Sequence, residues 1–239
     1  MSEIVRAIEK SPWEASYDGA DDPLLQLAMC ATEHARKKVP SSWLHAIKRR
    51  DWQGLARAFA TVDARAKALV TTTQAVDIIR GGSKVNALPE LVTAVVNHRI
   101  AFSHSIADVE KHLTKVIAPV AKRFNMPFYA FEESQVKLGE RYVTVSVQGT
   151  ALEPAPRSPT AGAVWDMFAG SARHSFKDIK HGDTPYIVSP GASTGNSDTK
   201  VYWNLSRNIF RFGGSLIEDY ESNIHSKRLC LLIEGRELC

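Results

Sequence analysis

The side chains best suited to binding chemistry lie in a segment that reads GGSKVNALPE and continues into AVVNHRI. Asn86 stands in a turn between two β-rich stretches, and Arg99 follows thirteen residues later, near the end of the second stretch. An amide offers donors and an acceptor, and a guanidinium offers a planar fork that suits a carboxylate. A turn residue and a strand-end residue can meet at one rim of a sheet, so the pair predicts an anion site. A simpler interpretation also fits: Asn86 caps its turn and Arg99 forms a surface ion pair.

A second polar segment, Gly195 to Thr199, precedes the aromatic-rich run VYWNLSRNIFRF. The loop could serve a binding site, or it could be an Asx-type turn in which Asp198 bonds its own backbone. His225 follows in the run ESNIH, and a lone histidine of this kind is usually a surface residue. The sequence contains no P-loop, GxGxxG, HExxH or GxSxG motif, so no complete catalytic constellation is present.

The composition is that of an ordinary globular protein. The 239 residues are 44% apolar and 23% charged, and the net charge is only +4, which does not by itself suggest a nucleic-acid partner. Three cysteines are too few and too scattered for a disulfide framework or a Cys-type zinc site. No apolar run approaches the roughly 18 residues that span a bilayer, and the first residues lack the order of a signal peptide.

The elements that must position these residues follow from hydrophobic spacing. Ile4, Val5 and Ile8 predict a short first helix, and further helices are expected over 24–35, 52–69 and 106–124. Pro119 should kink or shorten the last of these. Alternating β-rich stretches predict strands over 71–79, 91–100, 127–133 and 141–148. This order predicts an α+β two-layer sandwich with an antiparallel sheet and helices on one face.

A proline-rich stretch, Leu152 to Pro159, marks the clearest domain boundary, which divides the chain into residues 1–150 and 151–239. Beyond it we expect a helix over 161–172, a short strand over 186–189, an aromatic-rich strand over 201–212 and a final helix over 229–238. These elements read as part of a larger α/β unit.

In order along the chain, TTTQAVDIIRGGSKVNALPE, AVVNHRI and TGNSDT followed by YWNLSRNIFRF resemble the carboxypeptidase S branch of the di-zinc exopeptidases. That family also contains glutamate carboxypeptidase, aminoacylase and N-acyl amino acid hydrolases. The resemblance implies that residues 1–150 form the lid, or dimerisation, domain. It also implies that residues 151–239 are the C-terminal part of the α/β catalytic domain.

The resemblance also assigns roles to single residues. It implies that Asn86 and Arg99 bind the substrate carboxylate, that Gly195 contacts the substrate main chain, and that His225 is a zinc ligand. Ser197 replaces the usual threonine of the glycine loop, and the residues after His225 depart from the family pattern. The other zinc ligands and the general base belong to a family segment that precedes the lid and is not found in this sequence, so no catalytic residue is assigned.

Several expectations follow from the resemblance. The intact family enzyme uses two zinc ions to hydrolyse a peptide or N-acyl amide bond beside a free carboxylate. This chain alone is expected to be inactive and not to retain zinc, as a truncated gene model, a fragment or a degenerate paralogue. A non-catalytic dimerisation module or regulatory paralogue is the alternative. We also expect a homodimer that forms through the lid, no nucleic-acid partner and no membrane span. The expected location is the vacuole, with the cytoplasm as the alternative.

Overall fold

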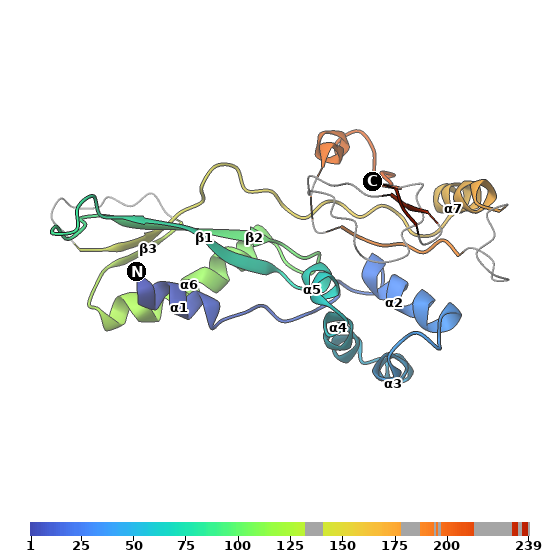
Figure 1. The fold of residues 1–239 in the computed structure, drawn as a ribbon, viewed down its shortest axis with the longest axis horizontal. Helices are drawn as coiled ribbons and strands as arrows, with labels where there is room; N and C mark the ends of the chain where they lie inside the picture. Colours follow the sequence, from blue (N-terminus) through green and yellow to red (C-terminus); the bar gives the residue numbers. More distant parts are fainter. Residues whose placement is uncertain are drawn as a thin grey trace.

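The computed structural model describes residues 1–131, 141–177, 187–193, 195, 197–212, 231–233 and 236–238. Three parts can be followed in Figure 1: a sandwich, a helical lobe and a C-terminal segment. The sandwich consists of α1 (Ser2–Glu9), β1 (Thr73–Gly81), β2 (Val92–Arg99), α6 (Ile106–Arg123), β3 (Phe128–Ala130) and β4 (Val143–Val145). The helical lobe consists of α2 (Pro23–His34), α3 (Ser41–Arg49), α4 (Trp52–Ala60) and α5 (Ala64–Val70). The C-terminal segment contains α7 (Ala163–Ser175), the 3-10 helix η1 (Asp198–Tyr202), β5 (Leu231–Ile233) and β6 (Arg236–Leu238).

The sandwich is built on the antiparallel hairpin of β1 and β2. Thr73 lies opposite Arg99 at its base and Gly81 lies opposite Val92 near its tip, with a register shift between Val76 and Ile78. Helices α1 and α6 lie together along one face of the sheet (Figure 1). The buried side chains at this contact are Ile8, Val109, Leu113 and Ile117, with Val76 and Val96 of the sheet packed against them. The predicted layer of helices on one face is confirmed.

Helix α6 shows why the spacing of apolar residues predicted a helix with one buried face. Ser105 and Asp108 form a capping box at its start. The buried residues recur every four positions and so form one face of the helix, which is the face that packs on the sheet: Val109, Leu113, Ile117 and Ala121. Pro119 lies inside the helix, which nevertheless continues to Arg123. The expected shortening at Pro119 is wrong, because Ile117 and Ala121 bury apolar surface on either side of the missing hydrogen bond.

The second pair of strands corrects the prediction of one antiparallel sheet. In the described residues, β3 and β4 form a separate two-stranded sheet in which the strands are parallel, with Phe128 opposite Val143 and Ala130 opposite Val145. Alternating apolar residues identify the buried face of a strand but carry no information about its direction. The prediction therefore found both strands and assigned the wrong pairing.

The helical lobe has a core of its own, in which Leu24, Leu55, Ala56 and Val70 are almost completely buried and Trp43 stacks on Phe59. The expected single helix over 52–69 is wrong: α4 ends before Thr61 and α5 begins at Ala64. Asp63 causes the break, because its carboxylate accepts a hydrogen bond from the Ala66 amide (2.6 Å) and so starts a new helix. Residues 1–150 thus contain two cores.

The two cores meet at a waist, formed by residues 10–17, 70–73 and 98–104 together with His112 of α6. The Ser16 amide donates to the Val70 carbonyl (2.9 Å), and the Ser16 hydroxyl donates to Ser103 (2.7 Å). The buried Thr72 hydroxyl accepts from the Ala101 amide (3.0 Å). These bonds fasten the helical lobe to the base of the β1–β2 hairpin.

The C-terminal segment is attached to the rest of the chain by Arg157, whose guanidinium bonds both the carboxylate (3.1 Å) and the backbone carbonyl (2.8 Å) of Asp18. The predicted helix beyond the proline-rich stretch is confirmed as α7. The rings of Phe168 and Phe210 stack at 4.6 Å, so the aromatic-rich run packs on α7.

Three expected elements of this segment are not found. Described residues 187–189 are not a strand, and residues 201–212 contain the end of η1 followed by irregular backbone rather than a strand. Aromatic side chains favour strands only where a neighbouring strand is available, and here the rings pack on a helix instead. The expected final helix is replaced by the antiparallel strands β5 and β6. Gly235 between them disfavours a helix and is typical of a hairpin connection.

Candidate carboxylate site

The structure brings together two residues that are distant in the sequence. Arg99 ends β2 at the base of the hairpin, where it is exposed. Gly195 lies beside it, because a Cβ atom placed on Gly195 would stand 3.9 Å from Arg99 Nη1. The Gly195 loop also folds back on itself, with the Gly195 amide 3.5 Å from the Ser193 hydroxyl that accepts its hydrogen bond. A residue of the sandwich and a residue of the C-terminal segment therefore share one site.

A second arginine reaches the same loop. Arg211 Nη1 donates a hydrogen bond to the Gly195 carbonyl at 3.1 Å. Sequence reasoning missed Arg211, although it stands between two aromatic residues in the run RNIFRF. Those neighbours, Phe210 and Phe212, both pack on Phe168 of α7 and so hold the backbone that carries Arg211. Two guanidinium groups thus flank one glycine, which is an arrangement suited to a carboxylate.

The residues after Gly195 are ordered by Ser197. Its hydroxyl accepts a hydrogen bond from the Thr199 amide (3.3 Å) and caps η1, and it lies 3.2 Å from the Thr199 hydroxyl. The described contacts therefore give the capping role to Ser197, where the sequence suggested Asp198. A serine hydroxyl is sufficient for this task.

Asn86 does not join Arg99 within one chain. It lies exposed in the turn at the tip of the β1–β2 hairpin, whereas Arg99 lies at the base. The seven steps along β2 from Val92 to Arg99 correspond to roughly 23 Å at about 3.3 Å per residue. The expectation that the two residues meet at one rim is wrong for a single chain, because the turn and the far end of the second strand are opposite ends of a hairpin.

A cavity of about 590 Å³ opens beside the Gly195 loop. Its lining includes Ser193, Thr199 and Arg211 from the region of the loop, and the aromatic side chains of α7 and of the run that packs on it: Trp165, Phe168, Phe176, Trp203, Phe210 and Phe212. Further positive charge in the lining comes from Arg157, Arg173 and Arg207. An apolar hollow with cationic groups suits an anion that carries a hydrophobic substituent.

Two negative findings concern the described part of the chain. Within it, no group of three or more histidine, cysteine, aspartate or glutamate side chains could hold a metal ion, so those residues do not fit a zinc centre. His225, the predicted zinc ligand, lies outside the described residues. No helix in the described ranges is long and apolar enough to cross a bilayer.

The waist contains three histidines, His98, His104 and His112, and two of them contact Trp13. The Trp13 ring lies 4.6 Å from the His104 ring and 4.4 Å from the His112 ring, measured between centroids. His104 Nδ1 lies 3.0 Å from the Thr72 hydroxyl, and His112 Nε2 lies 3.0 Å from the Ser11 carbonyl. Burial lowers the pKa of both His98 and His104, and the positive charge of His112 lowers both further. The Asp108 carboxylate opposes this by raising the pKa of His104.

Residues 1–125 match the family model described as "Peptidase dimerisation domain". The chain is 35% identical to Carboxypeptidase S of Saccharomyces cerevisiae, over 94% of this chain and 40% of that protein. It is 24% identical to the N-fatty-acyl-amino acid synthase/hydrolase PM20D1 of Bos taurus, over 66% of this chain and 26% of the relative. The chain thus spans about 40% of the length of its yeast relative. No solved structure matches.

Proposed function

The chain belongs to the M20 peptidase family, and we propose that it forms the dimerisation lid and the carboxylate-binding side of a carboxypeptidase or N-acyl amino acid amidohydrolase. The substrate would be a peptide or an N-acyl amino acid with a free carboxylate. The names of the relatives, a carboxypeptidase and an N-fatty-acyl-amino acid hydrolase, support this class of substrate.

One observation carries the proposal: Arg99, Gly195 and Arg211 lie together although they come from different parts of the chain. In the proposal Arg99 binds the substrate carboxylate through its planar fork. Gly195, which has no side chain, lets the substrate main chain approach the loop. Arg211 holds the Gly195 carbonyl in place, and the neighbouring cavity accepts the apolar part of the substrate.

Ligand binding to the 239-residue chain tests this assignment without requiring turnover. Trp165 and Trp203 line the cavity, so their fluorescence reports an N-acyl amino acid that enters it. We expect binding of the free acid to exceed that of its methyl ester about tenfold or more, and Arg99→Gln to remove the difference. Arg80→Gln, an exposed position on β1 of the same hairpin, is the matched control. Equal binding of acid and ester to the unaltered chain would contradict the proposal.

The position of Asn86 leads us to propose a shared site in a homodimer. Asn86 lies too far from Arg99 to act with it in one chain, so it would reach the carboxylate site of a partner subunit. The description of the matched family model supports self-association. The apolar residues around the turn support it as well, since Val85, Leu88 and Leu91 are exposed. Dimerisation would bury them and bring Asn86 to its proposed place.

We propose that this chain alone does not hydrolyse the substrate. The family's carboxypeptidases are generally metal-dependent, and His225 alone could not hold the two zinc ions that the resemblance implies. Zinc-dependent release of an amino acid by the purified chain, absent from a His225→Ala variant, would overturn this assignment. In the proposal, the described residues contribute carboxylate binding and positioning.

The alternative is a non-catalytic dimerisation module or regulatory paralogue. The match to the dimerisation family over residues 1–125, a region with two cores of its own, favours it. A dimer that binds no free carboxylate would support this alternative over the first proposal.

For location we propose the vacuole, with the cytoplasm as the alternative, and microscopy of a fluorescent fusion of the full chain distinguishes the two.

A further inference from the structure

The positive charge of the chain is concentrated in one short stretch. Residues 34–50 contain six lysine or arginine residues and no aspartate or glutamate: Arg36, Lys37, Lys38, Lys48, Arg49 and Arg50. The other 24 basic residues are outnumbered by 26 acidic ones, so the positive balance of the whole chain arises here. Such a local excess creates a strong field even where the net charge is small.

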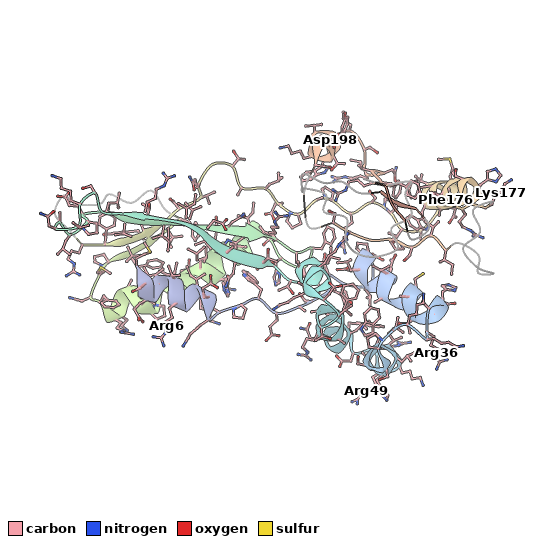
Figure 2. All side chains as sticks on the ribbon, in the orientation of Figure 1. Arg6, Arg36, Arg49, Phe176, Lys177 and Asp198 are labelled. Carbon is pink, nitrogen blue, oxygen red and sulfur yellow. The ribbon has the colours of Figure 1, made fainter. Side chains whose placement is uncertain are left out.

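The fold presents all six cations to solvent, and we call them the basic surface. Three precede α3 and three end or follow it, while α3 turns Trp43 and Ala46 into the core and leaves its polar side outward. Arg36 and Arg49 both lie along the lower edge of the helical lobe in Figure 2. The first cluster follows the C-terminal end of α2 and the second lies at the C-terminal end of α3, where the helix dipole favours positive charge.

Glu33 and Asp51 flank this stretch, but within the described part of the chain no acidic side chain forms an ion pair with any of the six cations. The ion pairs found there join Arg6 and Arg123 to Glu3, and Arg157 to Asp18, and none involves the basic surface. Long cationic side chains without partners keep their full attraction for an external anionic surface. The surface therefore fits a partner with many negative charges.

We propose that the basic surface docks on an anionic phospholipid bilayer. Trp52, two residues after Arg50, is also exposed, and its amphipathic ring suits contact with the headgroup layer. A nucleic acid fits less well, because single strands stack on several exposed aromatic rings, whereas the helical lobe exposes one, Trp52. Trp43, the aromatic residue between the two cationic clusters, is buried against Phe59. The proposal is independent of the carboxylate site.

The test is co-sedimentation of the full chain with vesicles of phosphatidylcholine containing about one third phosphatidylserine. Each Lys or Arg near such a surface contributes about a fivefold factor to the binding constant. We expect the triple variant Arg36→Gln, Lys37→Gln and Lys38→Gln to bind about 100-fold more weakly. Raising the salt from about 0.15 M to about 1 M should release the unaltered chain, because the screening length shortens.

The control removes the same number of exposed cations elsewhere, through Lys10→Gln, Lys84→Gln and Lys115→Gln. We expect it to bind the anionic vesicles within about threefold of the unaltered chain. Three results would each overturn the proposal: no binding to anionic vesicles, equal binding to vesicles of phosphatidylcholine alone, or an equal loss in the control variant. Binding to an oligonucleotide without binding to anionic vesicles would assign the surface to nucleic acid instead.

Discussion

At the scale of single residues, Arg211 holds the loop of the candidate carboxylate site within the C-terminal segment. Its guanidinium holds the Gly195 carbonyl, and Gly195 lies next to Arg99. Because the Arg211 side chain is exposed, replacing it by glutamine should change the free energy of unfolding by less than about 1 kcal/mol. Affinity for an N-acyl amino acid should fall about tenfold, because the loop loses its anchor. Titration followed by tryptophan fluorescence measures the dissociation constants of the unaltered chain and of the variant.

Arg207→Gln is the matched control for that prediction. Arg207 is an exposed arginine of the same run that also lines the cavity, and it makes no hydrogen bond to the Gly195 loop among the described contacts. An equal loss of affinity in the two variants would show that only the charge of the cavity matters, which would remove the positioning role of Arg211.

Asp22 is the single residue on which the start of the helical lobe depends. It is buried, and its carboxylate accepts hydrogen bonds from the backbone amides of Asp18, Leu24 and Leu25 at 2.8, 2.8 and 3.3 Å. Asp22→Ala leaves these donors without an acceptor and removes the cap of α2, so the free energy of unfolding should fall by about 2 kcal/mol. Urea denaturation checks this. The exposed neighbour Asp21→Ala should change it by less than about 0.5 kcal/mol.

At the scale of elements, the sequence was most informative where one element packs against one neighbour. Helix α6 was predictable because its buried side chains repeat every four residues, and β1 and β2 because their turn follows Gly81-Gly82. The parallel pairing of Phe128 with Val143 was not predictable, because strand direction depends on contacts distant in the sequence. The candidate carboxylate site shows the same limit: Arg99 was singled out from its place near the end of a strand and Gly195 from the resemblance, but Arg211 carries no spacing signal.

The waist makes stability depend on pH. Burial lowers the pKa of His98 and His104 below the ordinary value of 6.5, so the folded chain keeps these imidazoles neutral when the unfolded chain would take up protons. Their contribution to stability is therefore complete above about pH 6.5 and is lost as the pH falls through the region below it. Thermal unfolding followed by circular dichroism from about pH 8 to about pH 5 should show a falling Tm.

Two variants separate the waist histidines from the general effect of acid. His104→Gln removes one half-buried titrating ring beside Trp13 and should reduce the fall in Tm between neutral and acid pH. His45→Gln changes an exposed ring and should leave that fall unaltered. If both variants keep the slope of the unaltered chain, the waist histidines do not control the acid sensitivity.

At the scale of the whole molecule, the β1–β2 hairpin extends away from the waist to one end of an elongated chain (Figure 1). Asn86 lies in the turn at the tip of this hairpin. The tip of this hairpin lies too far from Arg99 to contribute to the same site within one subunit. It is suited to reaching a second copy. The apolar tip supports the same conclusion, because Leu88 is 94% exposed and Val85 and Leu91 are also exposed. Exposed aliphatic groups gathered at one place mark an interaction surface.

Self-association through this tip can be tested by one substitution. Leu88→Lys should weaken the dimer about tenfold or more, because a buried aliphatic contact is replaced by a charge. It should leave the Tm of the monomer unchanged, because an exposed turn residue contributes little to folding. Sedimentation velocity over micromolar concentrations measures the association. Leu205→Lys, an exposed leucine of the C-terminal segment, is the control. A chain that stays monomeric throughout, or a dimer that Leu88→Lys leaves intact, would remove the tip from the interface and with it the proposed place of Asn86.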